Sequence, residues 1–241
     1  MNGNVLTFVR GMMLAVLGGW SIAAQSLSID RMVLVSGQNK DDTFILTNNS
    51  KMPVFVRTEL ARIDVRSGQD HETPYTRENL AQWTLTVDPA LFILDPGESR
   101  KVNPRPLSEK ASRMHDEIYA ISFVPQAYNR GLKQANSMSI QVGFRAYYIV
   151  PATRSEMKYE LMYDRSSGKL ILDNRGNTAM FARLDQCLNG VPEQVDKPCS
   201  MNFMAVAGKI KKFDVPEWLR GSKMLFEVEN HDKSYHQEEL R

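Results

Sequence analysis

The sequence predicts an all-β fold made of two β-sandwich domains. Apolar or alternating runs recur at intervals of roughly ten residues, turn-forming residues separate them, and only 77–82 and 106–114 have helical character. A doubly wound α/β fold would instead place long helices between its strands. The predicted strands, in chain order, are 32–35, 43–46, 54–60, 83–87, 91–94, 118–124, 138–150, 158–163, 169–172, 180–184, 202–206 and 224–228.

Turn clusters and one proline divide these runs. Residues that accept tight turns gather at 36–38, 48–50, 95–97, 166–168 and 174–177. The domain break is expected at Val150-Pro151, because proline cannot donate a hydrogen bond to a β-ladder. The domains are therefore expected to span 25–150 and 151–241, and the polar tail from Asn230 onward is expected to fray.

Residues 1–24 have the parts of a secretory signal peptide. Arg10 precedes an uncharged stretch that runs from Gly11 to Ala24 and ends in small residues. About 14 residues are too few to span a bilayer, which takes about 20. A buried N-terminal helix is the alternative. Cleavage after Ala24, or after Ala23, would leave a soluble exported chain.

Charge and motifs argue against several classes of function. The 30 basic and 28 acidic residues nearly balance, whereas nucleic-acid-binding chains usually carry a basic excess. Asp70-His71-Glu72 and His115-Asp116-Glu117 combine acids with imidazoles, but neither has a nucleophile motif or a metal-ligand repeat beside it. Both triplets are interpreted as solvated loop charges. We expect no enzyme, cofactor, metal or small-molecule substrate.

Cys187 and Cys199 are the only cysteines. A close, even pair in an oxidising compartment is expected to form a disulfide. The loop-entropy model gives a loop of this size about 3 kcal/mol of stabilisation. Two buried free thiols are the alternative, and a zinc site is disfavoured because no histidine lies at ligand spacing nearby.

Residues 134–148 are the most informative stretch. The apolar residues Met138, Ile140, Val142 and Phe144 alternate with small or polar ones, as in a strand with one apolar face, and Arg145 follows directly. At a sheet edge, such a strand offers apolar side chains and unpaired backbone groups to a second chain, a hazard that proteins normally suppress. Here the hazard is a candidate function.

Five segments occur in an order that a known family shares. They are Ser28 to Gly37, with Arg31 six residues before the glycine; Thr47-Asn48-Asn49-Ser50 followed by Met52-Pro53-Val54; Pro89 with Leu94-Asp95-Pro96-Gly97-Glu98; Asp116-Glu117-Ile118-Tyr119; and Arg145-Ala146-Tyr147-Tyr148 before Pro151. Behind an export signal, this series resembles the PapD-like periplasmic chaperones of the chaperone-usher pathway, which assemble pili. The second domain matches only through 174–177, 206–208 and 213–216.

The resemblance implies two immunoglobulin-like domains in an L shape, with a pilin subunit bound in the cleft between them. In that family two basic residues anchor the subunit's C-terminal carboxylate, and motif position assigns this role to Arg31 and Arg145. An arginine fork suits a carboxylate, and charge-assisted bonds contribute about 1.5–3 kcal/mol each. We expect neither arginine to have a partner within the chain.

The resemblance also assigns two further features. The family's interdomain salt bridge would use Glu117, with Arg105 or Asn103 at the basic position. The cysteine pair lies in the second domain, which is similar to chaperones of the divergent, alternate branch.

The implied mechanism is donor-strand complementation, a form of β-strand addition. The strand containing Met138, Ile140, Val142 and Phe144 fills the groove of an incomplete fimbrial subunit, and the arginines fix its register. The complex would form in the periplasm and pass to an outer-membrane usher, the only link to a membrane. The alternatives are a secreted immunoglobulin-like adhesin or structural binding protein, in which 138–144 is a core strand, and a secreted hydrolase.

Overall fold

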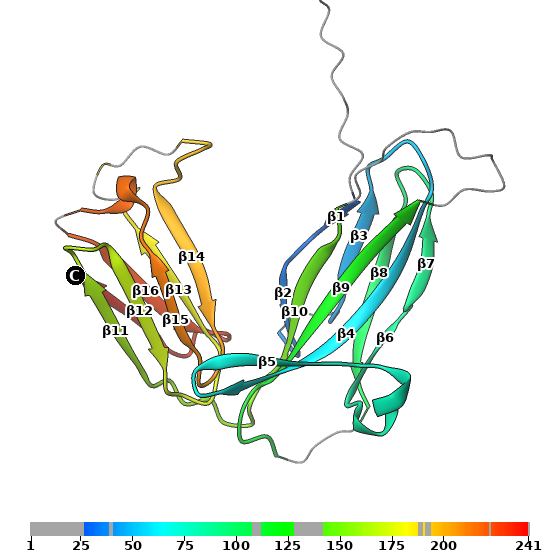
Figure 1. Cartoon of the computed structure of the whole chain (residues 1–241), viewed down its shortest axis with the longest axis horizontal. Helices are drawn as coiled ribbons and strands as arrows, with labels where there is room; N and C mark the ends of the chain where they lie inside the picture. Colours follow the sequence, from blue (N-terminus) through cyan, green and yellow to red (C-terminus); the bar gives the residue numbers. More distant parts are fainter. Residues whose placement is uncertain are drawn as a thin grey trace, which may run out of the picture.

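The structure, a computed structural model, describes residues 27–38, 41–107, 112–127, 142–187, 190, 194–221 and 223–240. Strands within these residues form four sheets, two from β1 to β10 and two from β11 to β17 (Figure 1). The predicted all-β fold of two sandwiches is therefore confirmed. The two sandwiches meet at one end and splay apart at the other, in the angular arrangement that the resemblance implies (Figure 1).

The first sandwich packs a four-stranded sheet on a larger one. The smaller sheet has the order β1 (Leu27–Ile29), β3 (Phe44–Asn48), β8 (Ser99–Pro106) and β6 (Leu85–Asp88). The larger sheet has the order β2 (Val33–Val35), β10 (Phe144–Val150), β9 (Glu117–Ala127), β4 (Val54–Arg66) and β5 (Gln69–Pro74), with β7 (Leu91–Leu94) paired to the start of β4. The core between them is apolar and closed to solvent, with Phe44, Leu46 and Phe123 fully buried.

The second sandwich has two smaller sheets. One has the order β11 (Tyr159–Asp164), β12 (Lys169–Asn174) and β15 (Ile210–Asp214), and the other has the order β14 (Ser200–Ala205), β13 (Met180–Asp185), β16 (Leu225–Asn230) and β17 (His236–Leu240). Leu170, Leu184 and Phe226 are fully buried in the core between them. A short 3-10 helix, η3 (Glu217–Leu219), precedes β16.

The polar C-terminal tail is a strand, so the expectation that it frays is wrong. β17 pairs antiparallel with β16. The turn between them is held by Asn230, whose side-chain oxygen accepts the Tyr235 N–H at 3.0 Å and whose amide donates to the Ser234 hydroxyl at 2.8 Å. A side chain that satisfies the turn's backbone allows polar residues to pair through their main chain.

Besides β17, four strands of the described residues have no counterpart among the predicted runs: β1, β5, β8 and β15. β1 is only three residues long, and the other three are mostly polar, so backbone pairing rather than an apolar alternation defines them. Of the two expected helices, 77–82 forms the 3-10 helix η1 (Arg77–Gln82). The other, 106–114, lies partly outside the described residues, and its first residue belongs to β8.

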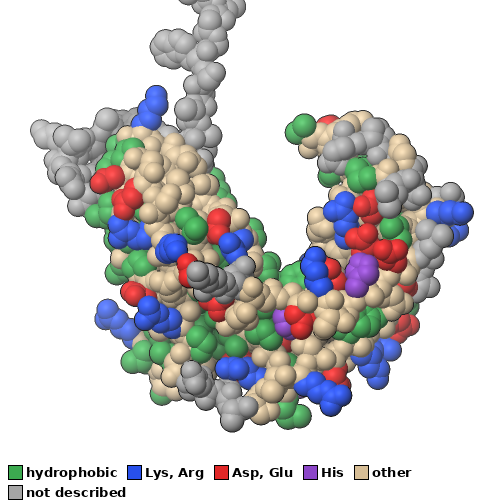
Figure 2. Space-filling model, turned by 180° about the vertical axis from the view of Figure 1, so that it is seen from behind, with side chains coloured by type: hydrophobic (Ala, Val, Ile, Leu, Met, Phe, Trp, Pro, Cys, Tyr) green, Lys and Arg blue, Asp and Glu red, His purple; other side chains and the backbone are tan. Residues whose placement is uncertain are grey.

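An apolar cluster joins the two sandwiches where they meet. The first sandwich contributes Val35, Ala61, Ile63, Ile118, Ala120 and Ile149, and the second contributes Ala179 and Val206, with Phe181 and Met204 packed against them. Beyond this contact a deep hollow separates the two halves (Figure 2). We call this hollow the cleft.

A buried carboxylate adds a polar link across the same junction. Asp116, 9% exposed, accepts the backbone N–H of Ala152 at 2.8 Å and that of Ala179 at 2.7 Å. It also accepts the Thr178 hydroxyl at 3.0 Å. The interpretation of this residue as a solvated loop charge is wrong, because donors from the linker and the second sandwich replace water around its oxygens.

Candidate functional site

The strand β10 has one edge that is only partly covered. β9 pairs with all of β10, whereas β2 pairs in parallel with Tyr147–Ile149 alone. On that side, no strand of the described chain pairs with Phe144–Ala146. The Tyr147 N–H donates to the Met32 carbonyl on the β2 side at 2.8 Å. Because N–H groups two residues apart on a strand point the same way, the Arg145 N–H faces the open edge.

The open edge follows from a change of sheet at the start of the chain. β1 belongs to the smaller sheet and β2 to the larger one, so the chain crosses between them after Ile29. Asp30 stays tied to the smaller sheet, since its N–H donates to the Ile45 carbonyl at 3.1 Å and its carboxylate accepts the Ile45 N–H at 2.8 Å. β2 can therefore begin only at Val33, which is too late to cover the start of β10.

Both predicted anchor arginines lie at this edge. Arg145 is on the same face of β10 as Tyr147 and Ile149, which pack in the apolar junction, so it faces the cleft. The parallel register pairs Tyr147 with Val33. Arg31 stands two residues before Val33, as Arg145 stands two residues before Tyr147, so both arginines come just before the first pair of this register.

Both arginines have internal carboxylate partners, so the expectation that they have none is wrong. Arg145 Nη2 lies 2.5 Å from Glu72 Oε2, and its Nη1 donates to the Ser122 hydroxyl at 3.3 Å. Arg31 Nε lies 2.8 Å from Asp30 Oδ2. The two arginine side chains are 40% and 38% exposed, so an external anion can reach them.

Part of the predicted donor strand lies outside the described residues, namely Met138 and Ile140. Val142 is 61% exposed, and Phe144 is half-buried against the first-sandwich core. Between them, Gly143 passes so close to β9 that an added Cβ would lie 2.6 Å from the Phe123 carbonyl oxygen. A role for these four apolar residues as donor-strand contacts stays a prediction.

The residues proposed for an interdomain salt bridge have other partners. Arg105 Nη2 lies 3.9 Å from Asp88 Oδ2 on the neighbouring strand. Glu117 Oε2 lies 3.8 Å from Arg113 Nε, and both side chains are mostly buried. Asn103 donates to the Asp88 carbonyl at 3.4 Å. The neighbouring Asp116 accepts hydrogen bonds across the junction at this point, and the Asn177 amide donates to the Met114 carbonyl at 2.8 Å.

Two tyrosines, on β9 and β10, are buried in the core of the first sandwich. Removal from water is the main cause that raises the pKa of Tyr119 in β9 and of Tyr148 in β10. The Tyr119 hydroxyl bonds to the Thr84 hydroxyl at 2.8 Å and donates to Glu117 Oε2 at 3.2 Å. Both rings therefore act as neutral, fixed supports for the two strands.

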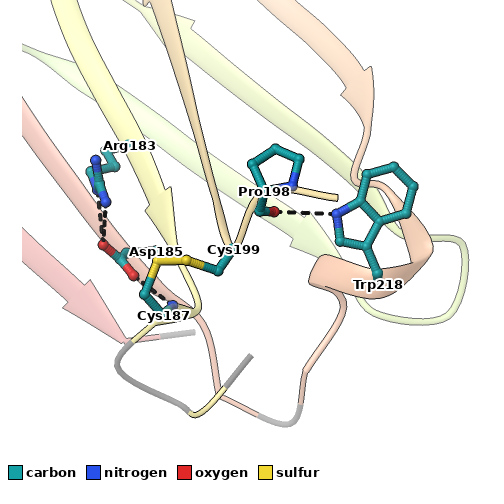
Figure 3. The surroundings of a disulfide bond; sticks show 6 residues. All are labelled: Arg183, Asp185, Cys187, Pro198, Cys199 and Trp218. Atoms are coloured by element: carbon teal, nitrogen blue, oxygen red, sulfur yellow. Dashed lines mark hydrogen bonds and ion pairs between the residues drawn. A yellow bond between two sulfur atoms is a disulfide. The ribbon is translucent and has the colours of Figure 1, made fainter. Parts of the chain in front are cut away.

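The cysteine pair forms a disulfide, which confirms that expectation. Cys187 follows β13 and Cys199 precedes β14, and their Cα atoms are 5.0 Å apart (Figure 3). The Cys187 N–H donates to Asp185, and the Trp218 indole donates to the Pro198 carbonyl at 3.3 Å. The bond lies in the second sandwich, away from the open edge of β10.

Within the described residues, no group of three or more His, Cys, Asp or Glu side chains could hold a metal ion. No helix in that part of the chain is long and apolar enough to cross a membrane.

Two residues that matter for this site escape sequence reasoning. Nothing in the sequence indicates that Glu72 reaches Arg145, because their strands are not neighbours in the sheet. Asp116 was detectable only as part of an acidic-aromatic motif, and its burial depends on donors that are distant in the sequence.

Among the solved structures with a similar fold are three that contain a chaperone. A chain in the CsuC–CsuE chaperone–tip adhesion subunit complex, from archaic chaperone-usher Csu pili of Acinetobacter baumannii, is similar with a TM-score of 0.53 and 11% identity, over 89% of this chain and 97% of that one. A chain in the Salmonella enterica SafA pilin–SafB chaperone complex has a TM-score of 0.52 and 14% identity, over 90% and 97%. The E. coli chaperone DraB has a TM-score of 0.50 and 12% identity, over 90% and 98%. These likenesses show the fold.

The family follows from the sequence itself. A family model described as the CS5 fimbrial protein N-terminal domain matches residues 29–151, just over half of the chain, and the chain therefore belongs to this family. A relative from Escherichia coli, an uncharacterized 25.9 kDa protein in the CS5 3' region, is 29% identical over 168 residues, which cover 67% of this chain and 70% of the relative. The expected resemblance to PapD-like fimbrial chaperones is confirmed.

Proposed function

We propose that this chain is a periplasmic chaperone that binds, folds and caps fimbrial subunits by donor-strand complementation. One observation supports this above all: the edge of β10 at Phe144–Ala146 is open beside Arg145, on the cleft side of a fimbrial-family fold. An open apolar edge is normally suppressed, so one that persists beside a cation in a cleft fits a site for an added strand.

The two parts of the site would divide the work of recognition. Backbone pairing along β10 and the side chains from Met138 to Phe144 would supply affinity by filling the groove of a subunit that lacks a strand. Arg31 and Arg145 would hold the subunit's terminal carboxylate and so set the register. A slip of one residue would turn the apolar set away from the groove.

Export and handover complete the proposal. The signal-like residues 1–24 and the disulfide both fit the oxidising periplasm. On release to an outer-membrane usher, the subunit would give up the strand that this chain had lent to its groove. Strand pairing provides the free energy of capture, so the role needs no catalysis and no cofactor.

Coexpression with a candidate fimbrial subunit, followed by pull-down, tests the proposal. Arg145→Glu should lose the subunit, because it places a negative charge where the carboxylate binds. Arg105→Glu is the matched control: it reverses an exposed arginine on the smaller sheet of the same sandwich and should keep the subunit. Normal recovery with Arg145→Glu would contradict the anchor.

A further inference from the structure

Glu72 forms an ion pair with Arg145, the residue that the proposed function assigns to the subunit's terminal carboxylate. Its Oε2 lies 2.5 Å from Arg145 Nη2, and the two side chains are 42% and 40% exposed. The chain thus supplies a carboxylate of its own at the anchor.

The position of Glu72 depends on how β5 is placed. In the order of the sheet, β9 and β4 lie between β10 and β5, so flat strands would keep Glu72 and Arg145 well apart. Their contact requires the end of the β4–β5 hairpin to curl over the cleft face. Figure 1 shows β5 crossing the region where the two sandwiches meet.

The tip of this hairpin is fixed to the second sandwich. The Gly68 carbonyl accepts the Ile210 N–H at 3.1 Å, and Asp70 Oδ2 lies 2.8 Å from Lys209 Nζ. Gly68 has φ +76°, a conformation that favours glycine, and an added Cβ would lie 2.7 Å from Ile210 Cδ1 and displace that side chain. Asp70 and Glu72 are two residues apart on one face of β5, so the contact with Lys209 helps to hold Glu72 over Arg145.

We propose that Glu72 is an internal stand-in for the subunit's C-terminal carboxylate, and that capture at Arg145 proceeds by exchange of one carboxylate for the other. This inference rests on the proposed function. Because the exchange replaces one carboxylate at Arg145 with another, a free carboxylate gains almost no binding free energy from it. A subunit gains more, since strand pairing on β10 raises the effective concentration of its carboxylate at Arg145. Glu72 therefore makes the anchor selective for a carboxylate that arrives with a strand.

The first test uses the protein without any subunit. Phenylglyoxal modifies accessible arginines, and mass spectrometry follows its rate at Arg145. Glu72→Gln should raise this rate roughly two- to fivefold, the range that corresponds to an exposed ion pair. Sodium acetate, compared with sodium chloride at equal ionic strength, should slow the reaction in this variant more than in the parent protein.

Asp70→Asn is the matched control, because it removes the same charge from the same strand but from a residue that pairs with Lys209. Its Arg145 rate should rise by less than that of Glu72→Gln. Equal Arg145 rates in the parent and Glu72→Gln, with circular dichroism showing both folded, would overturn the stand-in role.

The second test measures subunit capture. Glu72→Gln should bind a fimbrial subunit roughly two- to fivefold more tightly and should become sensitive to added acetate. Weaker binding would mean that Glu72 positions Arg145 rather than competing for it, and would overturn the inference. Retention of the subunit by Arg145→Glu would instead overturn the proposed function, and the reagent test in the free protein would still decide whether Glu72 shields Arg145.

Discussion

The two sandwiches differ in the strands that they expose at the edges of their sheets. In the first, the outer side of β10 is uncovered at Phe144–Ala146, beside the cleft. In the second, the outer strand β17 carries the consecutive polar residues His236, Gln237, Glu238 and Glu239, a composition that discourages pairing with another chain. Every sheet has outer strands, so the open start of β10 differs from β17 in its composition and in its place beside the cleft. This open start arises where the chain changes sheet between β1 and β2.

The interiors of the two sandwiches are much more alike. Asn48 donates to the carbonyls of Met52 and Leu94, both at 2.9 Å. Asn174 does the same with the carbonyls of Thr178 and Ala205, at 2.9 and 2.8 Å. Each asparagine is fully buried at the end of a strand. The scaffold is thus repeated, and the difference between the sandwiches is concentrated at their edges.

The largest effect is expected from a charge on the donor strand. Ile140→Asp should abolish subunit capture, because an unpaired carboxylate would be buried in the subunit's groove. Pull-down and thermal unfolding measure the two consequences. The melting temperature of the free protein should stay nearly unchanged.

Gln237→Asp is the control on the other edge strand and should leave both capture and stability intact. A large fall in the melting temperature of Ile140→Asp would favour the alternative in which 138–144 is a core strand, as in an adhesin.

A smaller effect is expected where the sandwiches are joined. Asp116→Ala should lower the free energy of unfolding by roughly 3–5 kcal/mol, because two backbone N–H groups and a hydroxyl lose their acceptor. Asp116→Asn keeps one acceptor oxygen and should lose less. Urea denaturation measures both variants, and a loss below about 1 kcal/mol for alanine would show that water replaces the carboxylate.

The smallest of these effects is expected from the disulfide. Replacing Cys187 and Cys199 together by serine should destabilise the second sandwich by about 3 kcal/mol. Subunit capture below the new melting point should be unchanged, because the bond lies beside β13 and β14 of the second sandwich and β10 belongs to the first. Loss of capture by the folded double-serine protein would mean that capture at β10 depends on the disulfide in the second sandwich.

The sequence predicts those parts of the molecule that depend on residues close together in the chain. Apolar alternation marks most core strands, and motif position places Arg31 and Arg145 at one edge. β5 escapes prediction because its residues are polar, so it has no apolar alternation, and its pairing with β4 is through the backbone. Contacts that depend on curvature or on distant donors are invisible in the same way, as Glu72 and Asp116 show. A charged triplet in the sequence does not reveal which of its members will be buried.

Amide hydrogen exchange at Arg145, resolved by NMR, reports whether the start of β10 is an open edge that a subunit covers. The Arg145 N–H should exchange fast in the free protein, whereas the Tyr147 N–H, which is bonded to Met32, should be protected. Adding a fimbrial subunit should slow exchange at Arg145 by about a hundredfold or more, with β17 amides unchanged as the internal reference. An Arg145 amide that is already protected in the free protein would show that this edge is not open, and one that stays fast in the complex would show that the subunit does not pair with it.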